Sequence, residues 1–300
     1  MTRLRRITLP MIATLVLLGQ DVLASHQRPK RIVSTTPSVT GILLAMQAPL
    51  IASAATTPSR LTDEKGFFTQ WARVADESGV EVLYHNLRFD IEAVVASDAD
   101  LLVASATGAD SVAPYRSEIE AQGVPVMVVN YSNQSWQAIA IELGKRTGLE
   151  QQAQAAIERF DAYAAKAAAS FMPPPGTVNV VGYNIAGSYS IGRSSSPHAR
   201  LLAALGFKVA DLPHSLEAKV TRASDFQFIS RENLPAAING DSVFLLGASA
   251  ADVQAFLGDP VLANLPAVQH KRVYPLGPSS FRIDYYSGQQ MIDTVVEQFR

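Results

Sequence analysis

Four arginines stand out among the residues that could do chemistry, because each lies in a loop that follows a predicted strand. They are Arg60 in TTPSRLTDEKG, Arg193 in SIGRSSS, Arg222 in KVTRASD and Arg282 in SSFRIDYYS. Ligands of open α/β sheets bind beyond the carboxyl ends of the strands. A guanidinium is planar, always charged and able to stack on aromatic faces, so a cluster of arginines suits an anionic partner with delocalised charge. Any single one of them could equally form a surface ion pair.

Signatures of common enzyme sites are missing from the sequence. It has no GxSxG elbow, no GxxxxGK[ST] phosphate loop, no HExxH pair and no GxGxxG loop. The five histidines are scattered, without metal-ligand spacing on one helix. An esterase would need an activated serine, and Ser194, Ser195 and Ser196 form a loop run without an elbow. We therefore expect a binding protein with neither a catalytic residue nor a metal site of its own.

The loops that carry the arginines must be positioned by short strands, and apolar runs predict where these lie. The first half of the chain has strand-like runs at 31–36, 50–55, 100–105 and 124–130, separated by helical segments at 39–46, 92–97 and 117–122. The second half has strand-like runs at 177–183, 242–246 and 272–275, with helices at 199–205 and 287–300. Short apolar strands that alternate with helices predict parallel α/β sheets.

The middle of the chain is helical and rich in alanine from Gln134 to about Met172, and the PPPG run that follows ends it. Gly144 and Gly148 are positions where this helix could be interrupted. A helix over 149–171 would be about 35 Å long, which is long for a helix inside one compact domain. The pattern alone leaves two alternatives, a single doubly wound domain or two lobes joined by a long helix.

The N-terminus is typical of an exported protein. Three arginines at positions 3, 5 and 6 precede an uncharged apolar run, and small residues at Val22 and Ala24 predict cleavage after Ala24. The run is shorter than the roughly 20 residues of a membrane-spanning helix. The 300-residue chain has no cysteine, so disulfides and a lipid-modified cysteine are excluded, and its net charge of −2 does not favour nucleic acid. We expect a soluble protein of the periplasm.

Three segments near the N-terminus, RIVSTTPSVTGILLAM, IASAATTPSR and GFFTQWARVA, resemble the periplasmic ferric enterobactin-binding proteins of iron-uptake ABC importers. LPAVQHKRVYPLG and FRIDYYSGQQMID resemble the C-terminal end of that family, and the resemblance runs from about Arg31 to Phe299. It implies a class III periplasmic binding protein, with two Rossmann-like α/β lobes joined by one long rigid helix. The expected divisions are a signal peptide (1–24), an N-terminal lobe (25–146), a connecting helix (147–172) and a C-terminal lobe (173–300).

The resemblance implies a ferric catecholate siderophore as the ligand, with iron held only by the catechol oxygens and no cofactor on the protein. Arg60 and Arg282 match basic residues of the family by position, whereas Arg193 and Arg222 are inferred from loop placement alone. Tyr285 is expected to cover a catechol ring. The family has a tryptophan near Gly192, so the identity of the siderophore stays open. A haem carrier, with an axial ligand such as Tyr285, Tyr286 or His85, or a hydroxamate carrier is the alternative.

The resemblance also implies docking on an inner-membrane permease dimer through one glutamate from each lobe. DIEAVVASDADLLVAS supplies Glu92, and ISRENLPA supplies Glu232. Both lie at predicted helix N-termini, where a carboxylate is favoured in any protein. We expect the protein to act as a monomer, because two separated acidic points on one rigid body fix its orientation on a pseudo-symmetric receptor.

Overall fold

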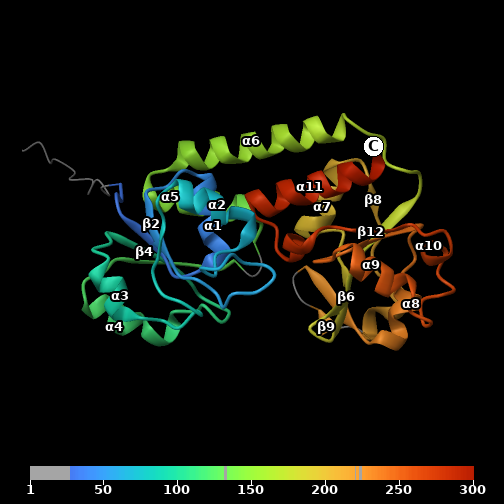
Figure 1. Ribbon diagram of the computed structural model, residues 1–300, viewed down its shortest axis with the longest axis horizontal. Coiled ribbons are helices and arrows are strands. Elements are labelled where there is room, and N and C mark those ends of the chain that lie inside the picture. The colour runs from blue at the N-terminus through green and yellow to red at the C-terminus, as the bar shows by residue number, and fades with distance from the viewer. Residues whose placement is uncertain (1–27, 132–133, 220, 223–224) are drawn as a thin grey trace, which may run out of the picture.

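The computed structural model describes residues 28–131, 134–219, 221–222 and 225–300. Two α/β lobes lie side by side beneath one long helix, α6 (Glu150–Ala168) (Figure 1). This arrangement confirms the expected fold class. The expected signal peptide, residues 1–24, lies outside the described residues. Over the part of the chain that the structure describes, no helix has both the length and the apolar character needed to cross a bilayer.

The N-terminal lobe is built on a parallel sheet with the strand order β3-β2-β1-β4-β5. Its strands are β1 (Ile32–Ser34), β2 (Leu50–Ser53), β3 (Glu81–Val82), β4 (Leu101–Ser105) and β5 (Val126–Val129). Its helices are α1 (Pro37–Ala45), α2 (Thr69–Glu77), α3 (Ile91–Ala96), the 3₁₀ turn η1 (Ala113–Tyr115), α4 (Arg116–Ala121) and α5 (Trp136–Thr147). Because parallel strands share one direction, the loops that follow β1, β2, β4 and β5 meet at one edge of the sheet.

Helix α6 is shorter than the predicted connecting helix, which was expected over 147–172. Gly148 adopts φ +69° and ends α5, and its N–H bonds to the Gly144 carbonyl oxygen. This left-handed cap is a common helix terminator that glycine adopts without strain. The helical segment predicted over 134–172 is therefore divided at Gly148, one of the two glycines where an interruption was expected, and α6, at 1.5 Å per residue, is about 29 Å long.

The C-terminal lobe carries a mixed sheet with the order β12-β11-β6-β7-β10-β9, and β8 pairs with the start of β6. Its strands are β6 (Thr177–Ile185), β7 (Ser188–Gly192), β8 (Lys208–Val209), β9 (Thr221–Arg222), β10 (Phe226–Ile229), β11 (Ser242–Leu245) and β12 (Val273–Pro275). Its helices and 3₁₀ turns are α7 (Pro197–Ala204), η2 (His214–Lys219), η3 (Arg231–Asn233), α8 (Leu234–Ala237), α9 (Ala250–Leu257), α10 (Pro266–Gln269), η4 (Pro278–Phe281) and α11 (Tyr285–Phe299).

The antiparallel ribbon of β6, β7 and β10 corrects the expectation of a purely parallel sheet in this lobe. Strand β6 turns back at Ala186 (φ +49°) and Gly187 (φ +82°), between the paired residues Ile185 and Ser188. Two successive positive φ angles make the type I′ turn whose twist matches that of a hairpin. Ala186, at the tip of the hairpin, lines the same cavity as Tyr131 of the other lobe.

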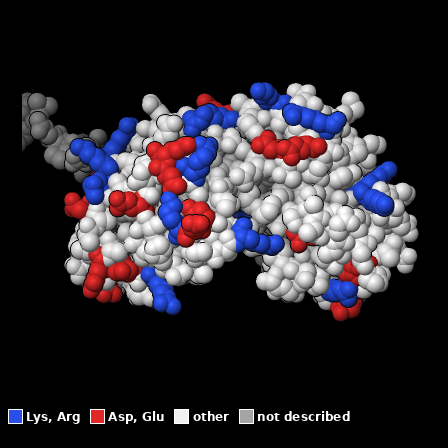
Figure 2. Space-filling model, viewed as in Figure 1, with Lys and Arg blue, Asp and Glu red and all other residues white. Residues whose placement is uncertain are grey.

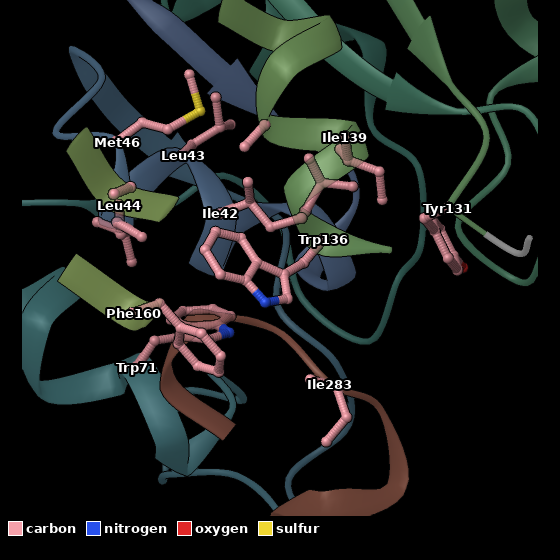
Figure 3. Packing of buried hydrophobic residues seen from close by; sticks show 14 of the residues in the cluster. Ile42, Leu43, Leu44, Met46, Trp71, Tyr131, Trp136, Ile139, Phe160 and Ile283 are labelled. Carbon is pink, nitrogen blue, oxygen red and sulfur yellow. The ribbon is translucent and has the colours of Figure 1, made fainter. Parts of the chain in front are cut away.

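Helix α11 ties the lobes together, because it starts at the junction and packs on helices of both (Figure 1). Its first turn is capped by buried Asp284, whose carboxylate accepts the Ser287 N–H at 2.7 Å. One continuous hydrophobic cluster joins Ile42 of α1 and Phe160 of α6 to Met291 of α11 and Phe244 of the C-terminal sheet. Figure 3 shows part of this packing, with Trp136 between Ile42 and Phe160. The junction is therefore packed like a domain core.

Candidate ligand-binding cleft

A cavity of about 360 Å³ lies between the two lobes and is lined by residues of both. The N-terminal lobe contributes Ser38, Ile42, Tyr131, Gln134, Trp136 and Ile139. In Figure 2 the lobes meet at a notch on the side of the molecule opposite α6. A second cavity of about 130 Å³ lies beside the first, since Ile185, Leu246 and Phe281 line both. The size of the main cavity falls within the range of small-molecule sites.

Strand alternation builds the C-terminal wall of the main cavity. Side chains two apart on a strand share one face, so Ser188 and Ser190 of β7 and Phe226 and Phe228 of β10 all reach the cavity. The register pairs Phe228 with Ser190 across the two strands. Phe228 is 42% exposed and Phe281 52% exposed, although both are large aromatic residues. Exposed aromatic rings in a concave wall are typical of a ligand site.

Arg282 follows η4 and reaches across to the N-terminal lobe. Its guanidinium lies 4.5 Å from the centre of the Tyr131 ring and donates to the Tyr131 carbonyl oxygen at 3.2 Å. The Tyr131 hydroxyl donates to Asp110 at 2.7 Å, and Asp110 also accepts from Thr36. Burial and the bond to Asp110 raise the pKa of Tyr131 to about 12, so this phenol stays neutral. Arg282 is thus an exposed cation held in the cavity by stacking on Tyr131 and by the hydrogen bond to the Tyr131 carbonyl oxygen.

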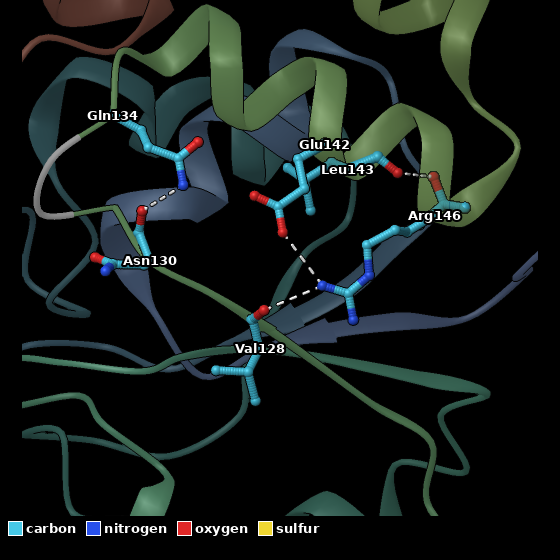
Figure 4. A network of polar contacts seen from close by, with 7 residues as sticks. Val128, Asn130, Gln134, Glu142, Leu143 and Arg146 are labelled. Carbon is cyan, nitrogen blue, oxygen red and sulfur yellow. Dashed lines mark hydrogen bonds and ion pairs between the residues drawn. The ribbon is translucent and has the colours of Figure 1, made fainter.

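The loop that carries Tyr131 is held at both of its described ends (Figure 4). Arg146 of α5 donates to the Val128 carbonyl oxygen of β5 at 3.1 Å and contacts Glu142 at 3.3 Å. The Gln134 side chain donates to the Asn130 carbonyl oxygen at 3.0 Å. These contacts fix α5 against β5, and they therefore fix the two cavity residues Tyr131 and Gln134.

Two further polar residues, His198 and Asp225, line the C-terminal wall. His198 of α7 is buried, and its Nε2 lies 2.6 Å from the Ser280 carbonyl oxygen. Burial lowers the pKa of His198 to about 4, so the imidazole is neutral. Burial raises the pKa of the Asp225 carboxyl. The positive charges of Arg282, Arg200 and Arg193 act in the opposite direction but do not cancel this rise. Sequence patterns gave no sign of either residue, because both depend on how β10 and η4 pack on α7.

The structure brings Arg60 and Arg282 to the region between the lobes. Arg60 lines the smaller cavity together with Asp252, whose carboxylate caps α9 by accepting the Ser249 N–H and hydroxyl. These two hydrogen bonds, and to a lesser extent the charge of Arg60, lower the pKa of Asp252. Arg193 lies behind the main cavity, where its N–H donates to the Asp225 carbonyl oxygen at 3.0 Å.

Arg222 and Tyr285 are placed differently from Arg60 and Arg282. Arg222 lies on β9 opposite Gln227 of β10, and its side chain lies outside the described residues. Tyr285 lines neither of the two cavities between the lobes. Its ring packs edge-on against Trp136 and beside Phe160, because the first turn of α11 directs it toward α5 and α6. Tyr285 therefore packs in the junction, and the expectation that it covers a catechol ring stays a prediction.

The serine run that an esterase would need has a structural role. Ser196 is buried, and its hydroxyl accepts the Ala199 N–H at 3.2 Å as the N-cap of α7. The Ser194 N–H donates to Asp211 at 2.8 Å. Within the described residues, no group of three or more His, Cys, Asp or Glu side chains is arranged to hold a metal ion.

Glu92 and Glu232 are both exposed, one on each lobe. Glu92 lies in the first turn of α3, which Asp90 caps by accepting the Ala93 N–H at 3.0 Å. Glu232 lies in η3, where hydrogen bonds from its own N–H and from Ser230 lower its pKa. In Figure 1, α3 and the α8 helix that follows η3 lie on the same long side of the molecule, opposite α6.

Residues 32–279 match the family of periplasmic binding proteins. The ferric enterobactin-binding periplasmic protein FepB of Escherichia coli O6:H1 is 40% identical over 278 residues, which cover 91% of this chain and 87% of the relative. The crystal structure of holo-ViuP is 37% identical, with a TM-score of 0.80 over 91% of this chain and 90% of that one. Staphylococcus aureus SirA is 18% identical and shares the fold, with a TM-score of 0.66 over 89% of this chain and 98% of that one. The chain therefore belongs to the family of periplasmic binding proteins.

Proposed function

We propose that this protein captures a ferric catecholate siderophore in the cleft and delivers it to the permease of an ABC importer. The observation that carries the proposal is the main cavity, which is lined both by Arg282 and by the exposed rings of Phe228 and Phe281. A ferric tris-catecholate is a trianion whose charge is spread over flat aromatic rings. Such a ligand needs both cations and apolar ring contacts. FepB, whose name states that it binds ferric enterobactin, is the sequence relative that supports this ligand class.

Arg282 would gain a second partner when the ligand arrives. Its guanidinium already stacks on Tyr131, and its exposed edge is free to bond a catecholate oxygen without losing that contact. Arg60 would add a second positive charge from the smaller cavity, and Arg193, from behind the main cavity, and Arg222 would add longer-range positive charge. Iron would enter only as cargo inside the chelator, so we propose no protein ligand to the metal and no cofactor.

Delivery would use Glu92 and Glu232 as the two contact points on the permease dimer. Both carboxylates are exposed, and α3 and α8 flank the notch between the lobes on one side of the molecule (Figures 1 and 2). Docking on that side would present the notch to the permease. We further propose that the protein works as a monomer in the periplasm after removal of residues 1–24.

A titration tests the ligand directly. Purified protein lacking residues 1–24 is titrated with ferric enterobactin, iron-free enterobactin, a ferric hydroxamate and haemin, using intrinsic tryptophan fluorescence. Trp136 lines the cavity, whereas Trp71 is buried on α2, so quenching should come mainly from Trp136. A filter assay with radioactive iron runs in parallel. Saturable submicromolar binding of the ferric catecholate alone is the expected result. Binding of the hydroxamate or haemin instead would move the protein to another ligand class.

A further inference from the structure

Asp110 binds the hydroxyl end of Tyr131, the residue whose ring contacts Arg282. The Tyr131 hydroxyl donates to Asp110 Oδ1 at 2.7 Å, and the Thr36 hydroxyl donates to Oδ2. The Arg282 guanidinium lies 4.5 Å from the centre of the Tyr131 ring. A carboxylate, a phenol and a guanidinium are therefore linked in series. Arg282, at one end of this series, lines the main cavity, whereas Asp110, at the other end, lines neither of the two cavities between the lobes.

Three loops of the N-terminal sheet meet at Asp110. Thr36 follows β1, Asp110 lies in the loop after β4, and Tyr131 follows β5, so all three lie at the edge where the parallel strands end. The loop after β4 passes close to the phenol. Gly108 has φ +90°, and a β-carbon at this position would lie 2.6 Å from the Tyr131 hydroxyl oxygen. Glycine is the residue that suits both this angle and this close approach, so the contact between Asp110 and Tyr131 is built into the packing of the loops.

The position of Asp110 keeps a negative charge near Arg282 without placing it against the guanidinium. Within the part of the chain that the structure describes, no carboxylate, Asp225 included, forms an ion pair with Arg282, and no cation forms one with Asp110. An ion pair would occupy guanidinium N–H groups that an anionic ligand needs. A hydrogen bond to a carboxylate instead polarises the phenol, and a more electron-rich ring attracts a cation more strongly.

We propose that Asp110 is a positioning residue, which acts through Tyr131 to hold the Arg282 guanidinium in the cavity while leaving N–H groups for an anionic ligand. This inference rests on the proposed function, because the ligand that Arg282 would bind is the ferric catecholate. It makes a specific prediction for a negatively charged residue near a trianion. Removing the charge of Asp110 should weaken binding, whereas direct repulsion between Asp110 and the ligand would make the same change strengthen binding.

The test is a set of double-mutant cycles, with ferric enterobactin affinity measured by the filter assay. Asp110→Asn keeps the shape of the side chain and removes its charge. Tyr131→Phe keeps the ring beside Arg282 but removes the hydroxyl through which Asp110 acts. The two changes are made alone, together, and each with Arg282→Ala, and thermal unfolding checks that every variant is folded. Asp98→Asn is the control, because Asp98 is exposed on the same lobe and lines neither cavity.

We expect Asp110→Asn and Tyr131→Phe each to weaken binding by about fivefold, the usual size of one cation–π contact, and Asp98→Asn to leave binding unchanged. The double variant should lose no more than about twofold beyond either single variant, because the series is already broken. With Arg282 replaced by alanine, Asp110→Asn should change affinity by less than about twofold. A residue that only stabilises the loop would weaken binding by the same factor with or without Arg282. That result, or tighter binding by Asp110→Asn, would overturn the inference.

Salt separates positioning from repulsion at a distance, because charges further apart than about 8 Å are largely screened at about 0.15 M salt and more so at about 0.5 M. The ratio of the affinities of Asp110→Asn and the unmodified protein should be the same at both concentrations, and a ratio that approached one at the higher would overturn the inference. If Asp110→Asn does not fold, Tyr131→Phe carries the test, since its loss should also disappear with Arg282→Ala. Failure of the unmodified protein to bind ferric enterobactin would overturn the proposed function, whereas equal binding by the unmodified protein and both variants would overturn this inference alone.

Discussion

At the scale of single residues, Arg282 is held by its contact with Tyr131, and this contact predicts what replacement should do. Arg282→Ala removes the cation of the main cavity, and we expect ferric catecholate affinity to fall by at least about tenfold, since charged hydrogen bonds are worth about 1.5–3 kcal/mol. Arg282→Lys should recover only part of the loss, because an ammonium cannot stack as a planar guanidinium does. The filter assay measures both variants.

Arg272→Ala is the matched control for Arg282, because Arg272 is also exposed but precedes β12, away from both cavities. Its affinity should match that of the unmodified protein. If Arg282→Ala bound the ferric catecholate as tightly as this control, Arg282 would not contribute to ligand binding.

His198 also predicts how stability depends on pH. Burial lowers its pKa from 6.5 to about 4, so between these values the unfolded chain binds a proton that the folded chain does not. The free energy of unfolding should therefore fall as pH drops from about 6.5 to 4, by about 3 kcal/mol in total from this residue. Between pH 7 and pH 4.5, the free energy of unfolding measured with urea should fall less in His198→Gln than in the unmodified protein.

The comparison with His198→Gln isolates this one residue. Asp225 and Asp284 have raised pKa values, so they act in the opposite direction, but they are common to both proteins. If the free energy of unfolding fell equally with pH in the two proteins, folding would not lower the pKa of His198.

Some of the residues that line the two cavities could be picked out from the sequence, and others could not. Arg60 and Arg282 were singled out because charged residues in loops are visible as residue types. Phe226 and His198 were not, since an aromatic residue or a lone histidine is usually a core or surface residue, and only the register of β10 and the packing of α7 bring these two to the cavity. The packing of Tyr285 on Trp136 was not predicted, because adjacency to Arg282 in sequence says little about direction at a helix start.

At the scale of elements, the contact between α6 and α11 explains how the junction is kept close-packed. Gly288 of α11 faces Phe160 of α6, and a β-carbon at position 288 would lie 2.7 Å from two carbons of that ring. We expect Gly288→Ala to lower the free energy of unfolding by about 1–3 kcal/mol, the usual effect of overpacking a core. Urea unfolding followed by circular dichroism measures the loss.

Glu297→Ala, on the exposed side of the same helix, is the control for Gly288→Ala and should change stability by less than about 0.5 kcal/mol. If Gly288→Ala were as stable as this control, α6 and α11 would have room to move apart.

The parallel half of the fold was predictable, whereas the antiparallel ribbon was not. Strands β1, β2, β4 and β5 are short apolar runs between helices, and this local pattern suffices for a parallel sheet. Strand β7 contains only five residues, three of them Ser or Gly, and its pairing is set by the turn at Ala186 and Gly187. A non-glycine residue with positive φ is rarely visible from sequence, so the hairpin that forms the cavity wall was missed.

At the scale of the whole molecule, the two lobes form one body, with a cavity between them and a hydrophobic junction. The hydrophobic cluster around Trp71, Phe160 and Met291 runs through both lobes, and α11 crosses between them. A body of this kind holds two distant surface points at a nearly constant separation. That property is what docking on a two-fold receptor requires.

The structure also fixes the backbone at Glu232, the second of the two proposed docking points. Arg231, next to Glu232 in η3, donates at 2.7 Å to buried Asp259, which also accepts from the Tyr183 hydroxyl at 2.7 Å. Burial raises the pKa of Asp259, but the hydrogen bonds from Tyr183, the Val261 N–H and Arg231 outweigh it and keep the carboxyl ionised. This ion pair fixes the backbone of η3 while leaving the Glu232 side chain in solvent.

We therefore predict that charge reversal at either docking point separates transport from capture. Glu92→Lys and Glu232→Lys should each lower iron uptake through the cognate permease by about tenfold or more, because a like charge at a docking contact costs several kcal/mol. Ferric catecholate affinity of the purified proteins should stay within about twofold, since neither residue lines the cavities. Glu158→Lys, on α6 at the opposite side of the molecule, makes the same charge change and should leave uptake intact. Uptake that fell equally in all three variants would point to net charge rather than docking, because the three share only their change in total charge.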